Sequence, residues 1–427
     1  MSDVQDRLKA LLSTQGVMSG AEFRVRAEDL QRRRAAGEFE IDRVVPGEVI
    51  GDPEDGFYLV RSDFPLDTAH GCMTLGSALE AEARHIAVSA NDEELQAFDP
   101  ETAVFVDTET TGLMGGAGTV AFLIGVGYFR DGVFRLDQCF LRDYDDEEPM
   151  LHYLNDLFKG AETLVSYNGK SFDLPLLRAR FITNRIPFRL ESAMHFDLVH
   201  AARRFWKKRL GDCSLGNIER EVLGIERHGD VAGAEIPQLW LDYLHTRDAR
   251  KLKAVFYHHK MDILSLAALT GHLSKTLEAP RGEGFEHEED RLSLLRIHFK
   301  QKRYGDVLDL AERLLEETEE KELMRDCLEM AGFASKRLGQ WQRMEDFWRL
   351  LIDAFPRHFV ARHELAKYYE HRKRDLPAAE RMCVEAIQYL ETRAGLEYEV
   401  AGAKPLASFQ HRLTRIRRKR GGQEREP

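Results

Sequence analysis

Hydrophobic and polar residues change their spacing along the chain, and the changes divide it into three parts and a tail. Over residues 1–100 the pattern is mixed. "VRAEDLQRRRAAG" has helical spacing, whereas "FEIDRVVPGEVIGD" and "GFYLVRSDF" alternate as short strands do. No group of residues in this N-terminal region indicates a chemical role, so we treat residues 1–100 as a mixed region of unknown role.

Residues 101–277 follow a different pattern, in which apolar runs come first and helices later. "AVFVD" is typical of a buried strand, and "TVAFLIGVGYF" and "VFRLDQCFL" predict two more strands joined by the turn Arg130-Asp131-Gly132. A helix, "EPMLHYLNDLF", a fourth strand, "TLVSY", and several helices follow, the last of them "LKAVFYHHKMDILSLAALTGHL". This order predicts an α/β domain with a mixed sheet flanked by helices.

Residues 286–395 carry only helical spacing. Three stretches each pair two amphipathic helices around a basic or glycine-containing turn. Aligning Tyr304, Trp341 and Leu376 gives periods of 37 and 35 residues, close to the roughly 34 of tetratricopeptide repeats. We therefore predict an all-α tetratricopeptide-like repeat domain, a kind of module that usually binds partners. Residues 396–427 are a basic C-terminal tail, which either follows a nucleic-acid backbone or is simply a soluble end.

Composition and charge narrow the class of protein only in part. No apolar run approaches the roughly 20 residues needed to span a bilayer, and the N-terminus lacks the features of a secretory signal, so we expect a cytoplasmic protein without membrane contact. The five cysteines are far apart, which argues against a structural zinc site and a disulfide framework. The net charge of −12 does not exclude a nucleic-acid partner, because polyanion binding depends on local patches.

Two acids at the end of the first strand indicate chemistry. "VFVDTETTGL" places Asp107 and Glu109 one residue apart, so both lie on one face if the strand continues that far. Neighbouring carboxylates in a buried setting repel each other and lose hydration, which a shared proton or a bound divalent cation would relieve. The alternative is that the strand ends at Val106 and both acids are solvated loop residues.

Further acids follow in positions that could join the first two. Asp173 comes just after "TLVSY", where a helix begins; it is either a helix N-cap or a group at the sheet edge where α/β sites form. His258 and Asp262 are four residues apart and therefore share one face of the last helix of this region.

In this order the residues resemble a known family. Asp107-x-Glu109, Asn168 with Asp173 in "YNGKSFD", and His258 with Asp262 are similar to the three motifs of the DEDD (DnaQ-like) 3′–5′ exonucleases, which have a ribonuclease-H-like fold. "DTETTGLMGGAGTVAFLIGVGYF", "CSLGNIEREVLGIER", "EIPQLWLDYL" and "HHKMDILSLAAL", followed by helical repeats, resemble the YprB-like branch, which includes mitomycin repair factor B.

The resemblance implies a metal-dependent 3′–5′ exonuclease that hydrolyses nucleic acid by a two-metal-ion mechanism, with DNA in repair favoured over RNA. It implies that two Mg²⁺ or Mn²⁺ ions are held by the four acids Asp107, Glu109, Asp173 and Asp262. His258 is then the candidate general base. It further implies substrate contacts at Thr110, Thr111, Leu113 and Asn168, and a protein partner such as a helicase for the repeats.

Three points stay open at this stage. His258 is four residues before the last acid, where the histidine subclass of the family has five; Tyr257 holds that position, and His259 is a further candidate base. An RNA exonuclease, or a non-catalytic adaptor built on a degenerate nuclease fold, are the rival functions, although retention of all four acids argues against the adaptor. "AARRFWKKRL" is either a surface that stacks single strands or a helix with a buried apolar face.

Overall fold

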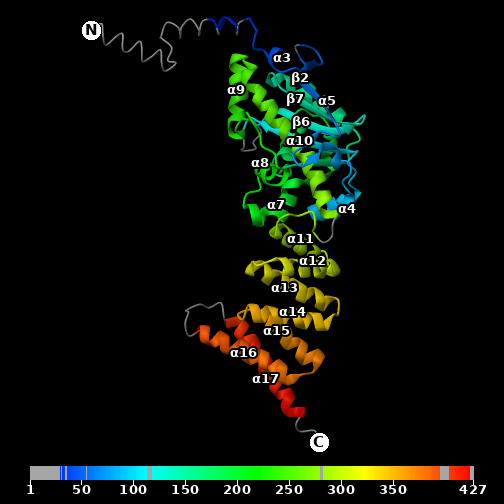
Figure 1. Ribbon diagram of the computed structural model, residues 1–427. Helices are drawn as coiled ribbons and strands as arrows, with labels where there is room; N and C mark the ends of the chain where they lie inside the picture. Colours follow the sequence, from blue (N-terminus) through cyan, green and yellow to red (C-terminus); the bar gives the residue numbers. More distant parts are fainter. Residues whose placement is uncertain are drawn as a thin grey trace, which may run out of the picture. The chain divides into compact units, whose positions relative to one another are not determined.

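The computed structural model describes residues 29, 31–33, 36–53, 55–112, 118–278, 282–394 and 403–423. The chain divides into two compact units, Met1–Lys275 and Thr276–Pro427. The first contains the strands, and the second is helical throughout its described residues (Figure 1). None of the described helices is both long enough and apolar enough to cross a membrane.

The first unit is built on a seven-stranded sheet with the order β1-β2-β7-β6-β5-β8-β9. β5 pairs in parallel with β8, and β8 with β9, while the other pairs are antiparallel. The predicted mixed sheet is therefore confirmed. Its strands are Glu48–Ile50 (β1), Phe57–Pro65 (β2), Ala103–Thr110 (β5), Ala121–Arg130 (β6), Val133–Phe140 (β7), Thr163–Ser166 (β8) and Met194–Asp197 (β9), and a separate hairpin joins Ala69–His70 (β3) to Met73–Thr74 (β4).

The N-terminal region contributes to the same sheet, which the sequence did not predict. β2 pairs with β7 along its length, from Tyr58 opposite Phe140 to Pro65 opposite Val133. The bidentate contact of Arg135 with Asp63 (2.7 and 2.8 Å) adds a cross-strand ion pair to this pairing. Residues 48–65 are therefore part of the sheet that carries the acids. β9 was also missed, because four residues are too few for alternation to show.

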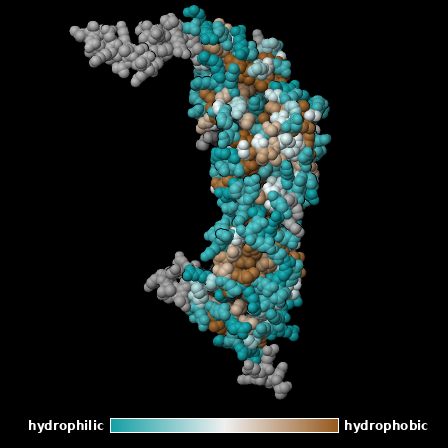
Figure 2. All heavy atoms as spheres, in the orientation of Figure 1, coloured by the Kyte–Doolittle hydropathy of each residue, from teal (hydrophilic) through white to brown (hydrophobic). Residues whose placement is uncertain are grey.

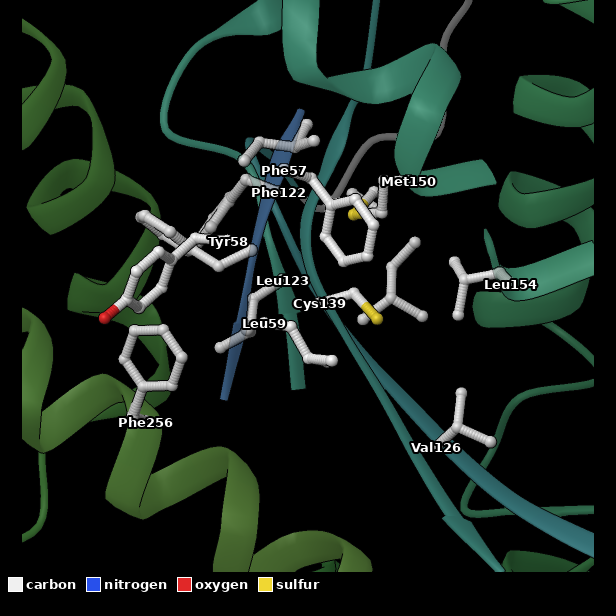
Figure 3. Packing of buried hydrophobic residues seen from close by; sticks show 14 of the residues in the cluster. Phe57, Tyr58, Leu59, Phe122, Leu123, Val126, Cys139, Met150, Leu154 and Phe256 are labelled. Carbon is white, nitrogen blue, oxygen red and sulfur yellow. The ribbon is translucent and has the colours of Figure 1, made fainter. Parts of the chain in front are cut away.

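Helices cover both faces of the sheet. Figure 3 shows Met150 and Leu154 of α5 on one side of the strands, and Tyr58 with Phe256 of α10 on the other. The helices of this unit are Ile41–Val44 (α3), Ala83–Ala90 (α4), Glu147–Leu157 (α5), Asp173–Thr183 (α6), Leu198–Leu210 (α7), Leu215–Ile218 (α8), Ile236–Thr246 (α9) and Leu252–Glu278 (α10). Short 3-10 turns occupy Leu75–Ala78, Glu93–Ala97, Tyr144–Asp146, Arg189–Ser192, Gly233–Glu235 and Ala249–Lys251, and a π-helical turn occupies Glu219–Leu223.

Two glycines in β6 allow α10 to lie close against the sheet. A Cβ on Gly125 would stand 2.0 Å from Cδ1 of Ile263 and 2.6 Å from Cε1 of His259, both on α10. A Cβ on Gly127 would stand 2.8 Å from Cγ2 of Ile263. Real side chains do not tolerate such distances, so glycine is required where the helix crosses the strand. Because Gly125 is paired with Asp107 of β5, this approach brings α10 beside the acidic end of β5.

The second unit consists of helices that each pack against the next, α11 to α17. Tyr304, Trp341 and Leu376, which the sequence aligned, are the first residues of α12, α14 and α16. Their tetratricopeptide-like character stays a prediction. On the face drawn in Figure 2, hydrophobic side chains reach the surface of this unit around α13. The helices are Glu288–Lys300 (α11), Tyr304–Glu317 (α12), Lys321–Arg337 (α13), Trp341–Ala354 (α14), Phe359–Tyr368 (α15), a π-helical turn Tyr369–Lys373, Leu376–Ala394 (α16) and Ala403–Gln423 (α17).

Most of the basic C-terminal segment is a helix, α17, and its cations have partners inside the unit. Arg412 and Lys419 each lie 2.8 Å from the buried carboxylate of Glu370, which Arg415 also contacts. Burial opposes ionisation, but the hydrogen bonds from Arg415 and Lys419 lower the pKa of Glu370 to about 2. Much of the positive charge that "RLTRIRRKR" shows in the sequence therefore fastens α17 to the preceding helices.

Candidate metal centre

The two acids of "VFVDTETTGL" both belong to a strand. β5 continues through Thr110, with Asp107 paired to Gly125 and Glu109 to Leu123, and its register shifts only after Glu109. Gly125 faces α10, and directly paired residues of two strands share one face of the sheet, so Asp107 faces α10 as well. Glu109 is two residues further along the strand and therefore lies on the same face. The alternative in which the strand ends at Val106 and the acids are solvated is therefore wrong.

α10 brings a histidine and a third acid to this face. Nε2 of His258 lies 4.0 Å from Oε1 of Glu109 and 3.4 Å from Oδ2 of Asp262. Glu109, His258 and Asp262 each offer one ligand atom, and these three atoms all lie within 4.8 Å of one another. Residues separated by about 150 positions in the sequence thus form a cluster with the dimensions of a metal site.

Asp173 is outside the three-residue cluster, but its charge interacts with Glu109 and Asp107. It is the first residue of α6, directly after the loop that follows β8, and its side chain is buried. Thr108 of β5 donates a hydrogen bond of 2.5 Å to Oδ1 of Asp173. Asp173 is not the N-cap of α6, a position that Phe172 holds.

Burial and mutual repulsion make these carboxylates hard to ionise. Burial raises the pKa of Asp107 well above its usual range, and the neighbouring charges of Asp262, Asp173 and Glu109 raise it further. Burial, followed by the charges of Asp262 and Asp173, raises the pKa of Glu109 to about 8. Burial also raises the pKa of Asp173 to about 6, although the Thr108 hydrogen bond opposes the shift.

The structure separates the three candidate bases. His259 is fully buried, with Nε2 3.1 Å from the backbone oxygen of Asp107 and Nδ1 3.1 Å from Nε2 of Gln138. Burial lowers the pKa of His259 to about 4, so this residue stays neutral and links α10 to β5 and β7. The ring of Tyr257 lies 5.6 Å from Nζ of Lys260. Of the two histidines, only His258 belongs to the ligand cluster.

Two residues beside His258 were not singled out by the sequence analysis. Nδ1 of His258 lies 2.9 Å from Oδ1 of Asp230, and Arg227 donates a hydrogen bond to Oδ1 of Asp262. Arg227 also lies 3.2 Å from Oδ2 of Asp230. Both residues are in the segment between the π-helical turn and α9, which has no regular spacing. The only signal in the sequence was that "CSLGNIEREVLGIER" ends on Arg227.

The residues that the resemblance implies for substrate contact lie around the acids. The Thr110 hydroxyl donates to the backbone oxygen of Gly112 (3.1 Å), and that of Thr111 accepts from the backbone N–H of Val120 (3.1 Å). Asn168 follows β8 with a φ of 66°, a left-handed conformation that asparagine tolerates better than most residues. Asp197 stabilises that turn by accepting from the backbone N–H of Asn168 at 2.7 Å. Leu113 lies outside the described residues.

The basic and aromatic stretch "AARRFWKKRL" forms the last ten residues of α7, and its aromatic rings are not available for stacking. Phe205 and Trp206 are both buried, whereas Arg203, Lys207 and Lys208 are exposed. This helix therefore has an apolar face in the core and a solvated basic face, the second of the two readings.

The donor set fits Mg²⁺ or Mn²⁺. The four carboxylates would carry a charge of −4 if all were ionised, and Arg227, which contacts Asp262, is shared with Glu219 and Asp230. Burial raises the pKa of Asp107 and Glu109, and the charges of neighbouring acids raise it further, as expected where negative charge is only partly compensated. Carboxylate oxygens are the ligands that hard divalent cations prefer.

We expect the stability of the metal-free protein to depend on pH in a direction set by these acids. Because the folded-state pKa values of Glu109 (about 8) and Asp173 (about 6) exceed the ordinary values of 4.5 and 3.8, protonation stabilises the fold. This stability is fully present below the ordinary values and is lost as the pH rises from about 4 to 8, by about 6 for Asp173 and by about 8 for Glu109. In EDTA the melting temperature should therefore fall across this range. Saturating Mn²⁺ should largely abolish the fall.

The matched control for this prediction is the double variant Glu109→Gln/Asp173→Asn, in which neither group titrates. Its melting temperature in EDTA should change less with pH than that of the wild type. An equal pH dependence in both proteins would contradict the assignment of the effect to these carboxyls.

Comparison with known proteins places the chain in a family. A family model described as the RNase H superfamily matches residues 104–274, the segment from β5 to α10 that carries the acids. The uncharacterised protein YprB of Bacillus subtilis (strain 168) is 32% identical over 335 residues, which is 76% of this chain and 79% of YprB. A family B DNA polymerase from the archaeon Pyrobaculum calidifontis matches with a TM-score of 0.32 and 14% identity, over 47% of this chain and 29% of the polymerase, a likeness too low to bear on fold or function. The chain therefore belongs to the ribonuclease-H-like nuclease superfamily, in the branch of YprB.

Proposed function

We propose that this protein is a metal-dependent 3′–5′ exonuclease that hydrolyses phosphodiester bonds of nucleic acid, with DNA in repair as the favoured substrate. The observation that carries the proposal is the convergence of residues from three separate elements. Glu109 of β5 forms a cluster of metal-site dimensions with His258 and Asp262 of α10, and Asp107 of β5 and Asp173 of α6 lie close enough for their charges to interact with these acids. Membership of a nuclease superfamily supports the same chemistry.

In this proposal the four carboxylates hold two Mg²⁺ or Mn²⁺ ions. Bound there, the ions would lower the pKa of a water molecule and stabilise charge on the phosphoryl and leaving oxygens. The protein's own part is to supply the oxygen ligands on rigid elements. Asp107 and Glu109 are fixed by the strand, Asp173 by Thr108, and Asp262 by Arg227.

His258 is the proposed general base, acting at Nε2. In this proposal the neutral ring carries its proton on Nδ1 and donates it to Asp230, whose Oδ1 lies 2.9 Å away, since a carboxylate accepts hydrogen bonds. Nε2 then carries the free lone pair and lies on the side of Glu109 and Asp262. A water between these groups and the substrate phosphate could give its proton to Nε2.

Substrate contacts are proposed for the loops next to the acids. Thr110 ends β5, Thr111 comes directly after it, and Asn168 follows β8, so these residues and Leu113 would hold the terminal nucleotide. The helical unit would bind a protein partner, such as a helicase, or guide the substrate. Its exposed apolar side chains Leu338, Leu350 and Val360 are candidates for such contacts.

The experiment that tests the proposal uses matched DNA and RNA strands of one sequence, single- and double-stranded, each incubated with the full chain and Mg²⁺ or Mn²⁺. We expect metal-dependent release of nucleotides, faster from DNA. Release from RNA at the higher rate would favour an RNA exonuclease. If neither substrate releases nucleotides with either cation, the non-catalytic adaptor is the better description.

A further inference from the structure

Arg227 links the candidate metal centre to a buried acid that the mechanism does not use. Its Nε lies 2.7 Å from Oε2 of Glu219, a residue whose side chain is 1% exposed. Glu219 opens the π-helical turn Glu219–Leu223, and it also accepts a hydrogen bond from Ser265 of α10. Turns of this kind are uncommon and occur often at functional sites. The Glu219 end of the pair is therefore fixed to two elements of the fold.

The other end of Arg227 contacts the metal centre itself. Its Nη2 donates to Oδ1 of Asp262, while Oδ2 of Asp262 lies 3.4 Å from Nε2 of His258, within the ligand cluster. Its Nη1 lies 3.2 Å from Oδ2 of Asp230, which holds Nδ1 of His258. One planar guanidinium thus contacts the carboxylate of Asp262 directly, and it contacts the carboxylate of Asp230 that orients His258.

Burial opposes the charge of Arg227, but the hydrogen bonds and charges of Glu219 and Asp262 raise its pKa above the ordinary value, so it is a permanent cation. Its side chain is 11% exposed, which leaves little freedom to leave these partners.

We propose that Arg227 is a positioning residue that holds the Asp262 carboxylate and the Asp230–His258 pair in the geometry that binds the divalent cation, and that Glu219 acts through Arg227. This inference rests on the proposed function, since it concerns the same metal centre. Partners that fix ligand carboxylates typically change metal affinity by about 10- to 100-fold when they are removed.

The sign of the effect separates positioning from simple charge. A fixed cation beside the site repels a divalent metal ion, so if charge alone mattered, removing it would tighten metal binding. If positioning dominates, removing Arg227 frees Oδ1 of Asp262 and loosens Asp230, and metal binding weakens. Replacement by lysine keeps the charge but loses the planar fork that contacts three carboxylates together.

The test measures the dissociation constant of Mn²⁺ for the full chain, from the free-ion signal in electron paramagnetic resonance. We expect Arg227→Gln to weaken Mn²⁺ binding by about 10- to 100-fold, and Arg227→Lys to weaken it by at least several-fold. Arg220→Gln is the matched control, because Arg220 lies in the π-helical turn, is 58% exposed and pairs with Glu221; its affinity should equal that of the wild type. Equal or tighter binding by Arg227→Gln would overturn the proposal.

Glu219→Gln supplies a second measurement that a general loss of structure would not reproduce. Glu219 contacts Arg227 and Ser265 but no proposed metal ligand. The substitution Glu219→Gln should therefore weaken Mn²⁺ binding when made in the wild type, and should have no further effect when made in the Arg227→Lys variant. Additive effects would overturn the claim that Glu219 acts through Arg227. Circular dichroism of each variant identifies those that fold. If Arg227→Gln does not fold, the Mn²⁺ affinities of Arg227→Lys and Glu219→Gln decide the outcome.

Failure of this inference is distinguishable from failure of the proposed function. If the wild type does not bind Mn²⁺ at a site that Asp107→Asn removes, both the proposed function and the role of Arg227 are contradicted. If the wild type has that site and Arg227→Gln keeps its affinity, only the role of Arg227 falls.

Discussion

Asp107→Asn should lower the rate of nucleotide release by about 1,000-fold, because loss of several kcal/mol of metal-dependent stabilisation of the transition state corresponds to about that factor. The substitution keeps the size and the strand position of the side chain while removing its charge. Burial raises the pKa of Asp107, and the charges of all three of the other acids raise it further, so a change at Asp107 affects every one of them. The rate is measured with a labelled strand at saturating Mn²⁺.

The same variant should be more stable than the wild type in EDTA at neutral pH. The ionised form of Asp107 is disfavoured by burial and by neighbouring charges, and asparagine removes that cost. Low activity together with a raised melting temperature would locate the defect in the site and not in the fold. Activity within a few-fold of the wild type would contradict the role of Asp107.

His258→Ala should lower the rate by about 100- to 10,000-fold, the range that a general base usually contributes. Tyr257→Phe, the neighbouring control, should leave the rate unchanged, because the Tyr257 ring lies beside Nζ of Lys260 and a phenol is a poor base at neutral pH. Rates from single-turnover experiments at several pH values would exclude a change in product release as the cause.

His259→Ala is expected to behave differently from His258→Ala. His259 is fully buried between Gln138 and the backbone of Asp107, so its removal should lower the melting temperature as well as the rate. If instead Tyr257→Phe caused the large loss and His258→Ala did not, the assignment of the base to Nε2 of His258 would be wrong.

The acids could be predicted because each depends on a local regularity. A strand has a period of two, so Asp107 and Glu109 share a face, and a helix returns after four residues, so His258 and Asp262 do as well. Placing Asp173 with them needed only the rule that parallel strands end at the same edge of a sheet, and β5 and β8 are parallel.

Other features depend on contacts that local pattern does not contain. Asp230 and Arg227 lie in an irregular segment, and only the folded chain brings them to His258 and Asp262. The spacing of "YHHKMD" could not tell which histidine lies near the acids, whereas the fold shows that His259 faces the glycines of β6 and His258 lies near Glu109. The strand Phe57–Pro65 was predicted as a strand, but its place beside β7 is a long-range pairing.

The most direct test of the central claim is the direction and metal dependence of strand shortening. A DNA strand labelled at its 5′ end is incubated with the full chain and Mg²⁺ or Mn²⁺, in parallel with the same strand labelled at its 3′ end. The account predicts a ladder of 5′-labelled products that shorten one nucleotide at a time, immediate release of the 3′ label as a mononucleotide, and no reaction in EDTA. Internal fragments as first products, release of mononucleotides from the 5′ end, or undiminished cleavage in EDTA would contradict it.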